Sequence, residues 1–276
     1  MLPILTSSRG RPAIVRLPSL LAGLVLGLLF LAFGAQAQSA PDSDWWSAIR
    51  RDDVSAVQAR LLRGTDTSAL NKIGNPALTQ AVREQSWRVY DVLLLAPGIQ
   101  IDQPNAQDET ALMYLCILGE TDRAAALIQA GAQLNRLGWT PLHYAASKGQ
   151  VDTARMLIKH GAIINAPGPD GTTPLMMAAL SGKSAMAQLL LDHGADPTMV
   201  TATGETAVDW ALKRNNTSMA KGIKAAAEQV RSQRARQAAG LPEPQPEPSP
   251  APAKDAQDAS SFSRYFDLDR FDEPVK

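Results

Sequence analysis

The chain has 276 residues, and its 27 Lys and Arg balance 27 Asp and Glu to give a formal net charge of +0 at pH 7. Such a balance gives no electrostatic reason to expect nucleic acid as the general partner. The single cysteine excludes an intramolecular disulfide, so packing alone must stabilise any folded domain.

Residues 1–37 predict a secretory signal peptide. Arg9, Arg11 and Arg16 form a basic leader, an apolar run covers 20–33, and Ala35-Gln36-Ala37 supplies a small-residue cleavage site. The run is shorter than the roughly 20 residues of a membrane span, which favours cleavage after Ala37 over the alternative of an uncleaved anchor. Cleavage leaves 24 Lys and Arg against 27 Asp and Glu, a formal net charge of −3 (24 − 27). We therefore expect a periplasmic or secreted protein without a stable membrane span.

A sequence unit recurs in the middle of the chain. Residues 138–147, Gly-Trp-Thr-Pro-Leu-His-Tyr-Ala-Ala-Ser, return 33 positions later (171 − 138) as Gly-Thr-Thr-Pro-Leu-Met-Met-Ala-Ala-Leu. The second half of the unit, at 158–162, returns at 191–195. A fixed period of this length predicts stacked repeats.

Each copy of the unit predicts two short helices joined by a turn. Thr140 can cap a helix, and Pro141 suits the first helical position, where no N–H donor is needed. Leu142 and the alanines that follow it lie on one face at helical spacing. Gly149 suits the left-handed residue that ends the helix, and Gly161 ends the second helix in the same way.

These motifs resemble the ankyrin repeat, in which Gly-x-Thr-Pro-Leu-His-x-Ala-Ala-x-x-Gly opens each unit. Residues 138–165 match closely, and 171–197 match except that Met176 replaces the histidine. Weaker copies begin near Leu112, 30 positions before Leu142 (142 − 112), near Leu78, and near Val208. An incomplete unit precedes them. The resemblance implies an all-α ankyrin-repeat solenoid of about six helix–turn–helix units over 44–230, and we expect a monomer.

The C-terminal part of the chain has a different composition. Residues 231–260 predict a polar helix extension followed by a Pro-rich linker, since proline alternates with polar residues from Pro242 to Pro250. We expect this tail to be disordered. Residues 261–276 combine aromatic and acidic side chains, and aromatics are uncommon in disordered tails. Two interpretations stay open. The segment is either a docking motif at the end of the linker or part of a disordered tail that carries aromatic side chains.

The sequence contains no recognisable catalytic motif, so we expect neither an enzyme nor a cofactor. His143 occupies the motif histidine, which in ankyrin repeats makes structural hydrogen bonds. His160 and His193 precede helix-ending glycines, where a histidine helps to satisfy terminal carbonyls. A metal bridging these last two is conceivable but lacks further ligands. Cys116 replaces an alanine of the apolar helix face and is expected to be buried.

In the ankyrin family, the two residues between Ala-Ala and Gly and the loop before Thr-Pro face the partner. Apolar residues at Ile117, Leu118 and Leu180 are therefore unexpected, and together with Trp139 they predict a protein-binding patch. The alternative is that Trp139 folds over Leu118 and buries it locally. The predicted partner-binding residues are Arg83, Ile117, Leu118, Trp139, Ser147, Lys148, Leu180, Ser181 and Lys213.

A second column of residues, one per repeat, comprises Tyr114, Tyr144, Met177 and Trp210. It suggests an aromatic ladder, although the position is better interpreted as packing between repeats. The sequence thus predicts a non-catalytic scaffold of the bacterial periplasm that binds a protein partner. The alternatives are an envelope-tethered or autoregulated module that uses the aromatic tail, and ligand binding or catalysis between repeats.

Overall fold

The computed structural model describes residue 41 and residues 43–241. The signal peptide predicted at 1–37, the Pro-rich linker from 242 onward and the aromatic tail at 261–276 lie outside the described residues. Within the described part, no helix is both long enough and apolar enough to span a membrane.

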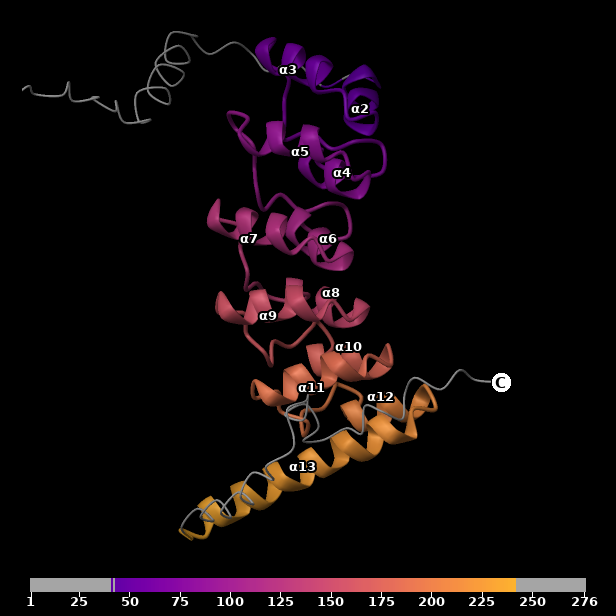
Figure 1. Cartoon of the computed structure of the whole chain (residues 1–276), viewed down its shortest axis with the longest axis vertical. Coiled ribbons are helices and arrows are strands. Elements are labelled where there is room, and N and C mark those ends of the chain that lie inside the picture. Colours follow the sequence, from indigo (N-terminus) through magenta and orange to yellow (C-terminus); the bar gives the residue numbers. More distant parts are fainter. Residues whose placement is uncertain (1–40, 42, 242–276) are drawn as a thin grey trace, which may run out of the picture. The chain divides into compact units, whose positions relative to one another are not determined.

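The described residues form twelve helices and no strand, which confirms the all-α repeat fold. The helices alternate as inner and outer members of six pairs, stacked in chain order (Figure 1). The inner helices are α2 (Ser43–Arg50), α4 (Ala77–Arg83), α6 (Ala111–Leu118), α8 (Pro141–Lys148), α10 (Pro174–Leu180) and α12 (Ala207–Lys213). The outer helices are α3 (Val54–Leu62), α5 (Trp87–Leu94), α7 (Thr121–Gln129), α9 (Val151–Lys159), α11 (Ser184–Asp192) and α13 (Thr217–Ala238).

Packing between neighbouring pairs stabilises these helices, most of which are too short to be stable in isolation. Each inner helix contacts the inner helix of the next pair, from α2 to α12. Leu78, Leu112, Leu142 and Leu175 occupy equivalent places along this series and are fully buried. The alanines that follow them are buried too, and their small side chains allow neighbouring helices to pack closely.

A chain of Asp and Asn side chains links successive pairs where each outer helix ends. The Oδ1 atoms of Asp102, Asn135 and Asn165 accept the backbone N–H of residues 133, 163 and 196 at 2.8, 2.9 and 2.8 Å. The side-chain amides of Asn135 and Asn165 also donate to the carbonyls of Gly161 and Gly194. Each of these side chains therefore fixes the position of the next pair.

The last outer helix differs from the others in length. α13 passes without a break through residue 230, where we placed the end of the repeat domain, and continues to Ala238. Arg234 in its second half pairs with Asp196 at 2.6 Å and donates to the Thr198 hydroxyl at 2.9 Å. The polar extension is thus continuous with the last repeat and bonded to the loop after α11.

The turn between the two helices of a unit requires a left-handed residue. Gly119 and Gly149 occupy this position after α6 and α8, with φ of 77° and 75°. Gln85 occupies the same position after α4, with φ of 56°. A side chain with a Cβ is strained in this region, which glycine adopts freely. Gln85 therefore stores strain in the second unit.

We predict that Gln85→Gly raises the free energy of unfolding by about 0.5–1 kcal/mol, because relief of the strain outweighs the added entropy of the unfolded chain. Urea denaturation followed by circular dichroism measures the change. Gln85→Ala is the matched control, since alanine keeps the Cβ; an equal gain in that variant would contradict the explanation by strain.

Candidate functional site

One side-chain position of every inner helix forms a continuous column, which we call the inner-helix column. It comprises Ser47, Gln80, Tyr114, Tyr144, Met177 and Trp210. Tyr114, Tyr144, Met177 and Trp210 are half-buried and pack against the core. The column therefore contributes to packing between repeats, as expected, and also presents aromatic edges to solvent.

Glu109, which precedes α6, joins two members of the column. The hydroxyl of Tyr114 donates to Glu109 Oε2, and the hydroxyl of Tyr144 donates to Oε1 at 3.0 Å. The side-chain amide of Asn105 donates to the same carboxylate at 3.1 Å. Burial of the ring is the main cause that raises the pKa of Tyr114, followed by the bond to Glu109. Both tyrosines are thus neutral hydrogen-bond donors at physiological pH.

Arg83 lies at the edge of this cluster. Its Nη1 donates to the Tyr114 hydroxyl at 3.0 Å, and the guanidinium carbon lies 5.1 Å from the centre of the Tyr114 ring. The side chain is exposed, and among the described residues no carboxylate forms an ion pair with it. Stacking on the ring therefore holds an unpaired cation at the surface.

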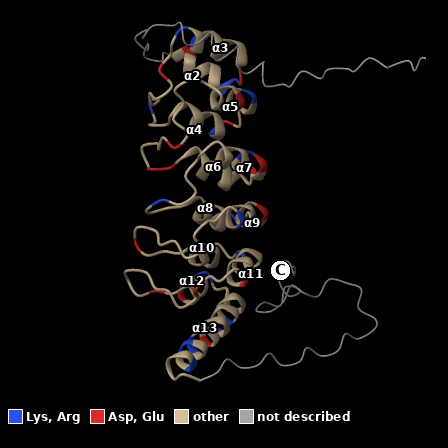
Figure 2. Cartoon of the chain, turned by 90° about the vertical axis from the view of Figure 1, so that its left-hand side faces the viewer, with Lys and Arg blue, Asp and Glu red and all other residues tan. Residues whose placement is uncertain are grey.

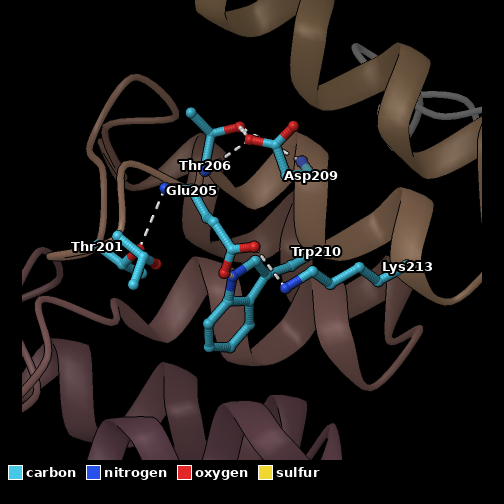
Figure 3. A network of polar contacts seen from close by, with 7 residues as sticks. Thr201, Glu205, Thr206, Asp209, Trp210 and Lys213 are labelled. Carbon is cyan, nitrogen blue, oxygen red and sulfur yellow. Dashed lines mark hydrogen bonds and ion pairs between the residues drawn. The ribbon is translucent and has the colours of Figure 1, made fainter.

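A similar cluster surrounds Glu205, which occupies the place of Glu109 in the last unit (Figure 3). Its carboxylate pairs with Lys213 Nζ at 2.5 Å and accepts from the indole N–H of Trp210 at 3.3 Å. The hydrogen bond from Lys213 is the largest of the causes that lower the pKa of Glu205. Lys213, a predicted partner-binding residue, is thus already neutralised within its own unit.

The three apolar residues of the predicted patch are less exposed than we expected. Ile117 and Leu180 are half-buried, and Leu118 is 37% exposed. The backbone carbonyl of Ile117 accepts from the side chain of Gln150 at 3.0 Å, so the end of α6 is packed against the following unit. The apolar centre is therefore mainly Leu118, and its role in binding stays a prediction.

Trp139 lies against the following unit. Its ring is 5.3 Å from that of His143 in an edge-to-face arrangement, and a side chain added at Gly168 would clash with it. The indole thus lies close to Gly168 of the following unit. Its part in partner binding stays a prediction, as does the alternative of local packing over Leu118. Among the other predicted residues, Lys148 and Arg83 are exposed, whereas Ser147 and Ser181 are half-buried.

His143 has the structural role that its position predicts. Nδ1 accepts the backbone N–H of Thr140 at 3.1 Å, and since that N–H only donates, the ring proton must lie on Nε2. Nε2 is 3.0 Å from the Thr172 carbonyl of the next unit and donates to it. Burial lowers the pKa of His143, which keeps the ring neutral.

The other two histidines and Cys116 are also structural. His160 and His193 bond the carbonyls of Met156 and Leu189 at 2.9 and 2.8 Å, as expected of histidines at helix ends. Cys116 is completely buried, and burial raises the pKa of its thiol. In the described part of the chain, no three residues of the metal-binding types lie together. The expected absence of a metal or cofactor stays a prediction.

The sequence reasoning missed the cluster around Glu109. Its signal was present, since a glutamate lies three positions before the recurring apolar residue at both Glu109 and Glu205. The significance of Arg83 also depends on the ring of Tyr114, which lies in the next unit. Only the stacking of the units brings these side chains together.

Comparisons with known proteins agree with this geometry. A family model described as ankyrin repeats in three copies matches residues 91–168, and one described as ankyrin repeats in many copies matches 157–211. Over residues 91–211 the chain is built of ankyrin repeats. Ankyrin repeats bind protein partners and generally serve as non-enzymatic scaffolds.

Two relatives illustrate the range of this family. Ankyrin repeat and SOCS box protein 2 of Bos taurus is 34% identical over 97 residues, which are 35% of this chain and 15% of the relative. The solved complex of a predatory endopeptidase with an immunity protein from Bdellovibrio bacteriovorus contains a similar chain, at 25% identity and a TM-score of 0.57. That match covers 67% of this chain and 98% of the other.

We predict that the free energy of unfolding falls as the pH drops from about 7.5 to 5.5, because the unfolded state takes up a proton that the buried His143 resists. The folded pKa is lowered, so this stability is complete above the unfolded pKa and is lost below it. Urea midpoints at the two pH values measure the loss. His143→Met, the residue that Met176 supplies in the next unit, should flatten the dependence; an unchanged slope would contradict the assignment.

Proposed function

We propose that the protein is a non-catalytic scaffold of the bacterial periplasm that binds a protein partner with its inner-helix surface. The signal-peptide pattern at 1–37 supports export, and the single buried cysteine suits a domain that folds by packing in an oxidising compartment. The ankyrin repeats support protein binding. The partner-binding residues named from the sequence lie on or beside this surface.

The exposed, stacked Arg83 carries this proposal. Arginine and tyrosine are the residue types that contribute most at protein interfaces, and here Tyr114 fixes the guanidinium in place before any partner arrives. Part of the conformational entropy of the side chain is therefore lost in advance. Leu118 and Lys148 extend the same surface along the next two inner helices.

A second candidate function is inhibition of a peptidase. The structural match to one chain of an endopeptidase–immunity protein complex favours it, since that match covers 98% of the other chain. For this chain, the corresponding activity would be to cover the active site of an exported hydrolase. The same inner-helix surface would make that contact.

We predict that Arg83→Ala combined with Leu118→Ser reduces partner capture from a periplasmic extract at least about tenfold, as expected when two contributing side chains are removed from an interface. The tagged mature chain serves as bait, and quantitative mass spectrometry compares it with the variant. The peptidase activity of the periplasmic extract is also measured with and without the tagged mature chain. A fall in that activity separates inhibition of a peptidase from simple capture.

The control combines Arg155→Ala with Leu95→Ser, which changes the same two residue types at exposed places on the outer side of the repeats. Leu95 is 86% exposed, so its loss costs little packing. Equal capture by both double variants and the unchanged chain would exclude the inner-helix surface as the binding site.

We also predict that the chain expressed in a Gram-negative host is recovered from the periplasm with Gln38 as its first residue. The combination of basic leader, apolar run and small-residue site directs cleavage there. Intact-mass measurement of the purified protein tests the site. A mass that includes residues 1–37 would contradict cleavage and favour the membrane anchor.

A further inference from the structure

The first two units leave a cavity in the inner-helix column. It has a volume of about 350 Å³, within the range of pockets that bind small ligands or side chains. Its walls come from α2 and from the loop and inner helix of the second unit, and their exposed surface is mostly apolar. Trp46 and Ile73 supply the main apolar surfaces, and Ile73 is 61% exposed.

The residues of the column explain why this cavity exists. Tyr114, Tyr144 and Trp210 fill the corresponding space in later units with an aromatic ring, and Met177 fills it in the fifth. The first unit has Ser47 at this position, and the second has Gln80. Gln80 turns toward Asn71, Asn75 and Glu84, to which it is bonded at 2.8, 3.0 and 2.6 Å. The cavity is thus the place of a missing aromatic ring.

The charges around the cavity indicate which charged groups a ligand should carry beside its aromatic ring. Arg50 and Lys72 are exposed cations of its lining, and Glu84 is the single carboxylate of that lining, occupied by the amide of Gln80. Arg50 donates to the Ser47 hydroxyl at 3.0 Å. An aromatic residue followed closely by carboxylates matches this combination of apolar walls and basic rim.

We propose that the segment Phe262–Phe271 of the same chain docks in this cavity. It contains Phe262, Tyr265, Phe266 and Phe271. Asp267 and Asp269 follow the central aromatic pair, and Arg264 and Arg270 lie on either side of this aromatic and acidic core. An aromatic ring of the segment takes the place that Tyr114 and Tyr144 fill in their own units, and the aspartates lie near Arg50 and Lys72. The docked segment covers the first units of the partner-binding surface, independently of which partner binds there.

The length of the intervening chain permits this contact. Residues 242–261, when extended, reach about 65 Å, at 3.3 Å per residue. Five steps between packed inner helices amount to about 40–50 Å, at 8–10 Å per step. The 22 residues of α13, about 33 Å long at 1.5 Å per residue, point away from the first units and add to this span, so the linker must be nearly fully extended (Figure 2). Because the segment belongs to the same chain, its docking does not depend on the protein concentration, although a linker stretched close to its full length gives a lower effective concentration than a slack one.

Paramagnetic broadening in the full chain tests the proposal. A nitroxide is attached to Ser263→Cys; Cys116 is completely buried and stays unlabelled in the folded protein. We expect loss of the Trp46 indole signal, together with that of the adjacent Trp45, whose ring centre lies 6.4 Å from that of Trp46, and we expect the signals of Trp139 and Trp210 to be retained. Replacing the four tail aromatics by serine, with the same label, should restore the Trp46 signal. Uniform broadening, or broadening centred on Trp139 or Trp210, would overturn the proposal.

Two variants of the cavity complete the test. Ser47→Tyr supplies the missing ring and should restore the Trp46 signal in the labelled chain, whereas Ser232→Tyr on the exposed part of α13 should not. If Ser47→Tyr fails to fold, the surface variant Ile73→Ser should restore the signal, because it removes an exposed apolar wall of the cavity. A Trp46 signal that stays broadened in both cavity variants would exclude this site.

The final arm distinguishes the chain's own tail from that of a second copy. Isotope-labelled chains without a nitroxide are mixed with unlabelled chains that carry it. We expect no broadening of Trp46 in the mixture. Broadening in the mixture that equals the effect within one chain would show that a second copy occupies the cavity, and docking within the chain would be wrong.

Discussion

The fold depends on the burial of each short helix pair between its neighbours. Apart from α13, no helix of the described part exceeds nine residues, a length that is marginal in water. Leucines and alanines of successive inner helices supply the apolar contact, and the Asp and Asn side chains between pairs fix the spacing. Position and stability therefore both come from the adjacent unit.

This dependence gives the inner-helix column two roles. Tyr114 and Tyr144 pack against the core and hold Glu109 between them, and the ring of Tyr114 also orients Arg83. The bonds that join units two, three and four thus also arrange the surface offered to a partner. Where the column has a small or diverted side chain, as at Ser47 and Gln80, the same surface is hollow.

The sequence predicted the features that repeat and missed those that arise between repeats. The period of 33, the Thr140 cap, the role of His143 and the burial of Cys116 follow from residue type and position within one unit. The half-burial of Ile117 and Leu180 did not follow from the pattern, and at Ile117 the following unit contributes through the bond from Gln150. The Glu109 cluster and the cavity beside Ser47 combine residues of two or three units, and no pattern within one unit contains them.

The equivalent bonds made by Asn135 and Asn165 have an evolutionary consequence. Each asparagine side chain is hydrogen-bonded to the same two backbone groups of the following unit, an N–H and a glycine carbonyl. A duplicated or deleted unit bounded by such residues keeps compatible junctions on both sides. The recognition surface can therefore lengthen or shorten in whole steps, so that new specificities arise by recombination without any redesign of the core.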